Sequence, residues 1–252
     1  MIDTDQDIRD ALGIDHLSRD SYVLYGSYAR GDYDPASDVD VLRITTKRMR
    51  ANRIDGQVSL HIYDIKDLLV MARQGSLFIL HLLREARPLH DPCKYLTDLS
   101  DAFQEPTSYV SAARQILQPA TCLIEIDESL FQTAPKAFLD VSIFLCRTLI
   151  YAEHADQGPF SFSLRSLAAM DKTANMISRI KNQSISYSDF RTIAEVVLQK
   201  MGKPVAPSNA SSIKELTQIG EGDPLFDALL RRIVERLGFD VYVMPAKAAE
   251  YK

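Results

Sequence analysis

The chain has 252 residues, enough for one large domain or two of ordinary size. Apolar residues make up 46% of it and charged residues 25%, which excludes a disordered or fibrous protein. The formal net charge of −5 argues against a protein that coats nucleic acid nonspecifically.

The first hundred residues mix predicted strands with predicted helices. Residues 4–12 fit a short helix that Asp3 or Thr4 caps. The hydrophobic pattern predicts strands at 22–25, 39–44 and 58–63 and helices at 64–73 and 76–86. Residues 87–92 break the helical pattern and are compatible with a short edge strand. Together these elements indicate a small mixed sheet.

Strand patterns almost disappear after residue 105, and segments of helical periodicity replace them. Apolar residues recur at helical spacing from Tyr109 to Phe131, and Pro119 is expected to kink or split that helix. Further helices are expected at 136–154, 163–171, 174–182, 187–201, 210–218 and 224–237. The segment 203–209 is the best linker candidate. We therefore predict an α+β fold, with a mixed N-terminal domain (1–105) and an all-helical domain (106–252).

The cysteines and the hydropathy of the chain indicate the cellular compartment in which the protein is expected. Cys93, Cys122 and Cys146 lie far apart with no CxxC pair, which argues against a disulfide framework or a zinc site and suits a reducing cytosol. The N-terminal segment MIDTDQDIRD is acidic and polar, unlike a signal peptide. No apolar run approaches the ~20 residues that cross a bilayer. We therefore expect a cytoplasmic protein with no membrane partner.

Two aspartates lie one residue apart at the start of the second predicted strand. Side chains alternate along a strand, so the carboxylates of Asp38 and Asp40 are expected to point the same way. Two close, partly dry carboxylates favour protonation of one of them unless a cation lies between them. Oxygen-only ligation favours Mg²⁺ or Mn²⁺. Two such ions can hold a triphosphate and stabilise the attacking and leaving oxygens.

A glycine and a serine follow the first predicted strand. Gly26 permits a tight turn, and Ser27 can begin a short helix whose free amide groups would face phosphate oxygens. Arg30 and the Ser27 hydroxyl can add donors. The ten residues between Ser27 and Asp38 form a loop that can bring both ends into one cleft, and Ser37 is expected to brace it as a turn residue.

The whole stretch GSYARGDYDPASDVDV, residues 26–41, resembles the signature of the DNA polymerase β-like nucleotidyltransferase superfamily. It looks closest to the minimal and antibiotic (aminoglycoside or lincosamide) nucleotidyltransferases. A later stretch, ILHLLREARPLHD at 79–91, resembles the helix and edge strand that close that catalytic domain. The resemblance covers roughly residues 20–92. It implies NTP as substrate, two-metal chemistry, Gly26 and Ser27 at the triphosphate, and Asp38 and Asp40 at the metals.

The sequence departs from the family where a third carboxylate is expected on a neighbouring strand. Ser59 or His61 stands there instead. His61 can act as a base near neutral pH or can be a histidine of the sheet with a satisfied hydrogen bond. Asp64 follows, either as the N-cap of the next helix or as a site residue. A further carboxylate can also come from the helical region, where the candidates are Glu125, Asp127 and Glu128.

Two further features concern partners. The helix predicted at 136–154 carries a polar and aromatic face, which consists of Asp140, Phe144, Arg147, Tyr151 and His154. Such a face suggests contact with substrate, with the cleft or with a second subunit. Six residues separate Arg147 from His154, a spacing that falls within the Arg-x(4–6)-His pattern of HEPN-type ribonucleases. Five cations lie between Arg43 and Arg53, where they can steer a nucleotide or tRNA or form a solvated hairpin.

The expected activity is transfer of a nucleoside monophosphate, AMP from ATP, to a hydroxyl acceptor, with release of pyrophosphate. The expected catalytic residues are Asp38, Asp40 and His61, and the expected nucleotide-binding residues are Gly26, Ser27, Arg30 and Ser37. The acceptor is a small molecule, a protein or a tRNA, and a homodimer or a toxin partner is compatible with the sequence. The alternative is a catalytically weak nucleotide-binding regulatory protein of a toxin–antitoxin or defence pair.

Overall fold

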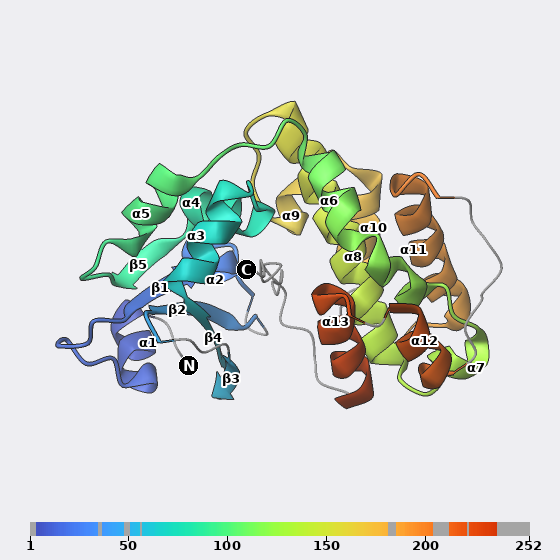
Figure 1. The fold of residues 1–252 in the computed structure, drawn as a ribbon, viewed down its shortest axis with the longest axis horizontal. Helices are drawn as coiled ribbons and strands as arrows, with labels where there is room; N and C mark the ends of the chain where they lie inside the picture. The colour runs from blue at the N-terminus through green and yellow to red at the C-terminus, as the bar shows by residue number, and fades with distance from the viewer. Residues whose placement is uncertain are drawn as a thin grey trace. The chain divides into compact units, whose positions relative to one another are not determined.

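The computed structural model describes residues 4–34, 37–47, 51–55, 57–180, 185–203, 212–220 and 222–235. The chain forms two compact units (Figure 1). The first comprises Met1–Pro106 together with Ser161–Ser163, and the second comprises Thr107–Phe160 and Leu164–Lys252. The possible cap Asp3 and nearly all of the predicted linker lie outside the described residues.

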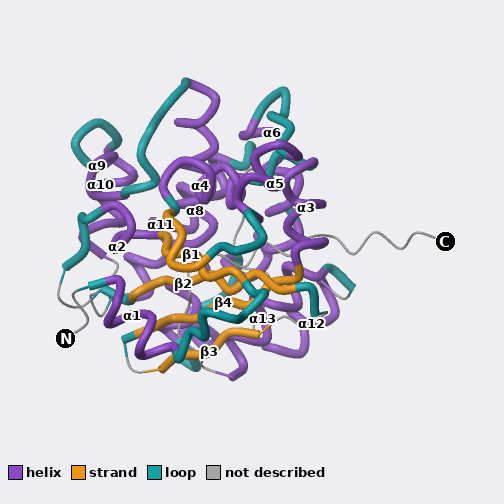
Figure 2. The backbone as a smooth tube through the Cα atoms, turned by 90° about the vertical axis from the view of Figure 1, so that its left-hand side faces the viewer, coloured by secondary structure: helices purple, strands orange, loops and turns teal. Residues whose placement is uncertain are grey.

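A five-stranded mixed sheet forms the centre of the first unit. Its strands are β1 (Ser21–Tyr25), β2 (Val39–Thr45), β3 (Ala51–Asp55), β4 (Val58–Asp64) and β5 (Arg87–His90). They follow one another in the order β3-β4-β2-β1-β5. Figure 2 shows β3, β4, β2 and β1 in this succession. β2 and β4 pair in parallel, and the other pairs are antiparallel. The predicted mixed sheet and the predicted edge strand are confirmed.

The strand β3 was not expected from the sequence. The hydrophobic pattern left 47–53 as a basic connection, but Ala51–Asp55 pairs antiparallel with β4 and forms one edge of the sheet. The segment reads ANRID, which alternates weakly and has one β-branched residue. Pairing with the neighbouring strand, rather than local propensity, therefore determines its conformation.

Five helices accompany the sheet: α1 (Asp5–Leu12), α2 (Gly26–Arg30), α3 (Ile65–Arg73), α4 (Leu77–Glu85) and α5 (Tyr95–Ala102). Thr4 caps α1 in a reciprocal arrangement, because its hydroxyl accepts from the Asp7 amide at 3.1 Å and its amide donates to the Asp7 carboxylate at 2.9 Å. All but α5 were predicted. Both the cap and the helix boundaries follow from local sequence signals.

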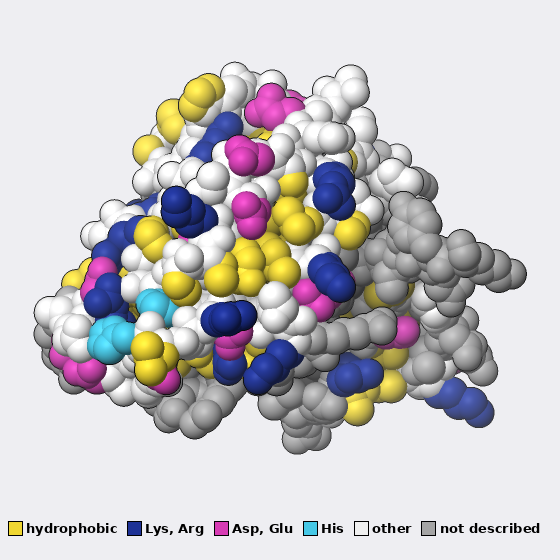
Figure 3. Space-filling model, turned by 60° about the vertical axis from the view of Figure 1, so that its left-hand side comes forward, with side chains coloured by type: hydrophobic (Ala, Val, Ile, Leu, Met, Phe, Trp, Pro, Cys, Tyr) yellow, Lys and Arg dark blue, Asp and Glu magenta, His cyan; other side chains and the backbone are white. Residues whose placement is uncertain are grey.

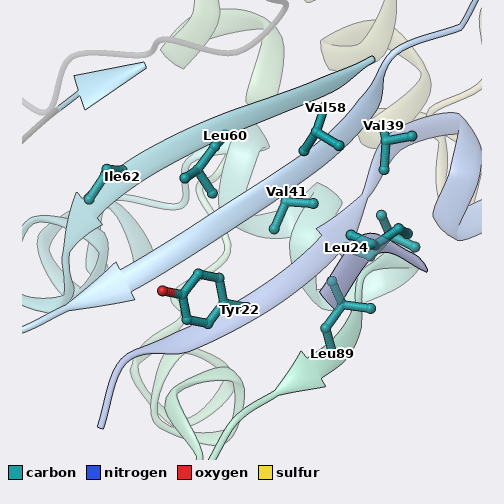
Figure 4. Close-up of a cluster of buried hydrophobic side chains, with 9 residues drawn as sticks. Tyr22, Leu24, Val39, Val41, Val58, Leu60, Ile62 and Leu89 are labelled. Atoms are coloured by element: carbon teal, nitrogen blue, oxygen red, sulfur yellow. The ribbon is translucent and has the colours of Figure 1, made fainter. Parts of the chain in front are cut away.

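The central strands β1, β2 and β4 are largely buried on both faces, and this separates their alternate side chains into two sets. One face carries a hydrophobic cluster of Ile8, Tyr22, Leu24, Val39, Val41, Val58, Leu60, Ile62 and Leu89 (Figure 4). On the other face, Tyr25 and Tyr63 each lie 5.9 Å from the ring of Phe78 in α4. Asp40 alternates with Val39 and Val41, so it belongs to this second face.

The second unit consists of helices. They are α6 (Tyr109–Leu117), the 3₁₀ helix η1 (Pro119–Ile124), α7 (Glu128–Phe131), α8 (Pro135–Gln157), α9 (Leu164–Leu167), α10 (Lys172–Ile180), α11 (Tyr187–Lys200), α12 (Ile213–Gly220) and α13 (Pro224–Glu235). Pro119 splits the first helix as predicted, since it lacks the amide needed to continue α6. The long α8 contacts α6, α10, α11, α13 and η1. The predicted α+β fold with a helical region is confirmed.

Candidate functional site

Three strand ends meet at one end of the sheet. Tyr25, the last residue of β1, is paired with Asp40 in β2, and Asp40 is paired with Ser59 in β4. Because β1 runs antiparallel to β2, the chain leaves β1 at the same end at which it enters β2. The topology thus brings the turn at Gly26 to the aspartates although 14 positions separate Gly26 from Asp40 in the chain.

Gly26 lies directly against the carboxylate of Asp40. Its φ of +73° is in the left-handed region, and a Cβ built on it would lie 2.6 Å from Asp40 Oδ2. Backbone conformation and space therefore both require glycine here. The short helix α2 begins at this residue and ends before Gly31, whose φ is +77°. The predicted turn into a short helix is confirmed.

The two aspartates are placed differently from each other. Strand β2 begins at Val39, so Asp38 precedes it and is exposed, whereas Asp40 is inside it and half-buried. Within the described residues, no group of three or more His, Cys, Asp and Glu side chains is arranged to hold a metal ion. The carboxylate of Asp40 lies beside the glycine turn, and Asp38 precedes it by two positions, so the oxygen donors available here are carboxylates. Such a set fits a hard divalent cation that takes its other ligands from phosphate and water.

The position of the missing third carboxylate is occupied by a buried polar pair. Ser59 is 2% exposed and His61 is 1% exposed. Ser59 Oγ and His61 Nε2 share a hydrogen bond of 3.2 Å, and the His61 ring lies edge-on to Tyr25 at 6.1 Å. This environment favours the interpretation of His61 as a histidine of the sheet interior.

Two of the other candidate carboxylates, Asp64 and Asp127, act as helix caps. The Asp64 side chain accepts a hydrogen bond of 2.9 Å from the Lys66 amide at the start of α3, so the predicted cap is confirmed. Asp127 caps α7, because it accepts 2.8 Å bonds from the Leu130 amide and the Ser129 hydroxyl, and these bonds lower the pKa of its carboxyl group. Capping thus gives each of the two acids a local role within its own unit.

The loop between the turn and the aspartates is tied together by side chains. The Asp34 amide donates to Ser37 Oγ at 3.0 Å, and the Ser37 amide donates to the Asp34 carbonyl at 2.9 Å, which is the brace expected of Ser37. Gln57 Nε2 donates to the Ser37 carbonyl at 3.1 Å and to the Tyr28 hydroxyl at 2.8 Å. Because Tyr28 lies in α2, Gln57 joins that helix to the residue before Asp38.

Arg30, expected at the triphosphate, forms ion pairs within the first unit. Its Nη1 lies 2.9 Å from Glu85 Oε2 and its Nε lies 3.1 Å from Asp32 Oδ1. Its side chain is 16% exposed, and that of Glu85 is 10% exposed. The structure therefore joins the last residue of α2 to the last residue of α4. No local sequence signal indicated a role for Glu85.

The groups around Glu85 determine the pKa of its carboxyl group. Burial by itself raises the pKa of the carboxyl group, but the His81 imidazole, the Phe162 amide and the Arg30 guanidinium outweigh burial and lower the pKa to about 2. The carboxylate is thus charged in the folded protein over the whole physiological range.

Acid unfolding should report the ionised Glu85. A folded-state pKa below the unfolded value of 4.5 contributes stability that is fully present above about pH 4.5 and lost as the pH falls to about 2. We expect Glu85→Gln to lower the free energy of unfolding by on the order of 3 kcal/mol at neutral pH, and by much less near pH 2. Urea unfolding of both proteins across this range measures the difference. A difference that is constant with pH would contradict the assignment.

The polar face of α8 is held by contacts within the second unit. Lys136 Nζ lies 3.2 Å from Asp140, and His154 Nε2 lies 3.4 Å from Asp171. Arg147 is buried, with 6% exposure. These contacts give Asp140 and His154, two of the five residues of the face, ion-pair partners within the second unit.

A family model for the nucleotidyltransferase domain matches residues 7–73. Residues 7–73 are a nucleotidyltransferase domain. The match covers β1, the Gly26 turn, both aspartates and β4, and it confirms the DNA polymerase β-like superfamily that the motif indicated. No curated protein matches the chain significantly. In the described residues, no helix is both long and apolar enough to cross a bilayer.

Proposed function

We propose that the protein transfers a nucleoside monophosphate, AMP from ATP, to a hydroxyl acceptor and releases pyrophosphate. One observation supports this most strongly: in a nucleotidyltransferase domain, the backbone of Gly26 approaches the Asp40 carboxylate so closely that no side chain fits between them. That arrangement brings backbone amide groups and the Asp40 carboxylate, which would hold a cation, to the same end of the sheet.

Each site residue has a proposed role. The amides of Gly26 and Ser27, with the Ser27 hydroxyl, would bind the triphosphate. Asp38 and Asp40 would hold divalent cations, Mg²⁺ or Mn²⁺, which when bound neutralise phosphate charge. Ser37 keeps the loop before Asp38 in its turn. Because His61 is 1% exposed, we propose a structural role for it rather than that of a base.

The reaction needs no covalent intermediate with the protein. The acceptor oxygen forms a bond with the α-phosphorus while the bond between the α-phosphorus and the bridging oxygen to the β-phosphate breaks, and the hydroxyl proton passes to water. The chain contributes mainly by positioning, since the fixed turn and the carboxylates set the triphosphate relative to the acceptor.

The acceptor class is open to direct screening. On the face drawn in Figure 3, Lys and Arg side chains are interspersed with Asp and Glu side chains around a hydrophobic patch. Such a mixed surface gives no preference for a nucleic acid over a small molecule or a protein. All three classes of acceptor therefore belong in the screen.

One observation favours a second function, a nucleotide-binding regulatory module with weak catalysis. The strand position expected to supply a third acid holds Ser59 and His61, both buried. A site with only two carboxylates can bind a metal–nucleotide complex and turn it over slowly.

Incubation of the protein with α-labelled ATP and Mg²⁺, with small molecules, proteins or tRNA as acceptors, separates the two functions. We expect label to appear on one acceptor class and pyrophosphate to be released in equal amount. Calorimetric binding of ATP with no labelled product from any acceptor would instead establish the binding module. Absence of both binding and product would contradict both proposals.

A further inference from the structure

Three residues between α8 and α9 belong to the first unit, which contains the nucleotidyltransferase domain, although they lie far from that domain in the sequence. Ser161–Ser163 is part of the first compact unit although the preceding residues of that unit end at Pro106. Ser161 Oγ donates to Glu85 Oε1 at 3.1 Å, and the Phe162 amide donates to the same oxygen at 2.6 Å. Ser163 Oγ donates to Asp32 Oδ2. We call Ser161–Ser163 the returning segment.

Phe162 anchors the returning segment in the core. It is 2% exposed, and its ring centroid lies 4.6 Å from that of His81, which is itself fully buried. The His81 ring lies edge-on to Tyr25 at 5.9 Å, and Tyr25 immediately precedes Gly26. A continuous row of rings therefore runs from the returning segment to the residue before the turn.

The two oxygens of Glu85 face different partners. Oε1 accepts the two hydrogen bonds from the returning segment, whereas Oε2 lies 2.9 Å from Arg30 Nη1 and 3.1 Å from His81 Nε2. One half-buried carboxylate thus connects the returning segment with the last residue of α2. Asp32, which pairs with Arg30 Nε, receives the Ser163 hydroxyl as well.

These contacts hold the far end of a helix that is too short to be stable alone. Helix α2 has five residues, and an isolated helix of this length does not form in water. Arg30 and Asp32 flank Gly31, so Glu85 and Ser163 fix the chain on both sides of the helix end. Small displacements of a binding group lower catalysis strongly, so a fixed end matters for the amides at the start of the same helix.

We propose that Glu85, supported by the returning segment, is a positioning residue that fixes the turn of residues 26–31 in its nucleotide-binding conformation. It acts through Arg30 and does not touch the nucleotide. The role in nucleotide binding rests on the proposed function, whereas the fixing of the turn does not. The first unit therefore depends on the returning segment, which lies far along the chain from the other residues of that unit.

Hydrogen exchange in the full-length protein tests the fixing of the turn without any activity measurement. In Ser161→Ala/Ser163→Ala, loss of two hydrogen bonds should speed exchange of the amides of Gly31 and Asp32, which both donate to the Ser27 carbonyl, about fivefold or more, while amides of β1 and β2 keep their rates. The matched control is Ser100→Ala/Ser111→Ala, which removes two exposed hydroxyls on α5 and α6. Unchanged exchange at Gly31 and Asp32 would overturn the proposal.

Calorimetric titration of ATP with Mn²⁺ tests the consequence for the nucleotide. We expect Glu85→Gln to weaken binding about tenfold, and Glu105→Gln, an exposed acid of the same unit, to leave it unchanged. If Glu85 acts through Arg30, the effect of Glu85→Gln disappears in an Arg30→Gln background, whereas additive effects would contradict the proposal. A wild-type protein that binds no ATP would refute the proposed function, and hydrogen exchange would still decide whether the segment fixes the turn.

Discussion

Replacing Asp40 by asparagine should lower the rate of nucleotidyl transfer about a thousandfold. Asparagine keeps the shape of the side chain but removes the negative charge that would hold a divalent cation. Metal ions contribute several kcal/mol of transition-state stabilisation in such reactions, and each 1.4 kcal/mol corresponds to about a factor of ten in rate. We expect the same loss for Asp38→Asn. Initial rates with α-labelled ATP at saturating Mg²⁺ measure both variants.

The control for this experiment is Asp101→Asn, because Asp101 is an exposed acid at the end of α5 in the same unit. It should keep the wild-type rate, and all three variants should unfold within a few degrees of the wild type. Full metal-dependent activity in either Asp38→Asn or Asp40→Asn would show that the carboxylate pair is not the metal site.

Gly26→Ala should destabilise the protein and abolish nucleotide binding. An alanine in the left-handed region costs about 1–2 kcal/mol, and forcing a methyl group to within 2.6 Å of Asp40 Oδ2 adds roughly 1–3 kcal/mol of overpacking. The carboxylate has to move to make room, which displaces it from the turn. Chemical unfolding and calorimetric titration with ATP and Mn²⁺ measure the two effects.

Gly31→Ala is a closely matched control for the backbone cost. Gly31 has a φ of +77°, close to the +73° of Gly26, but a Cβ there meets no atom within 4 Å. It should therefore cost about 1–2 kcal/mol of stability and weaken nucleotide binding far less than Gly26→Ala does. Equal losses of stability and of affinity in the two variants would contradict the claim that contact with Asp40 is what requires Gly26.

Most of the fold could be predicted because local signals were strong. Thr4 and Asp64 cap helices whose amphipathic patterns are clear, and Pro119 splits a helix where its missing amide requires it. Strand β3 could not be predicted, since its residues form a strand only by pairing with β4. Elements that local interactions stabilise could be predicted from the sequence. The conformation of β3 depends on its partner strand, so local sequence signals did not indicate it.

The residues of the candidate site also fall into two groups, those that the sequence indicated and those that it did not. Gly26, Asp38 and Asp40 belong to one contiguous motif, so their spacing was readable. Glu85 could not be identified from the sequence, because its partners Arg30, Ser161 and Phe162 lie 55, 76 and 77 residues away from it. The motif indicated a basic residue near the triphosphate, so Arg30 was expected there. A motif does not indicate which side chains its residues contact, so the ion pairs of Arg30 with Asp32 and Glu85 could not be predicted.

Manganese bound with a non-hydrolysable ATP analogue tests the central claim most directly. In crystals of the full-length protein soaked with both, anomalous scattering locates the metal independently of any model of the chemistry. The account predicts a manganese peak bridging the carboxylates of Asp38 and Asp40, with the triphosphate against the Gly26 turn. Bound nucleotide with no manganese between these two carboxylates would contradict it.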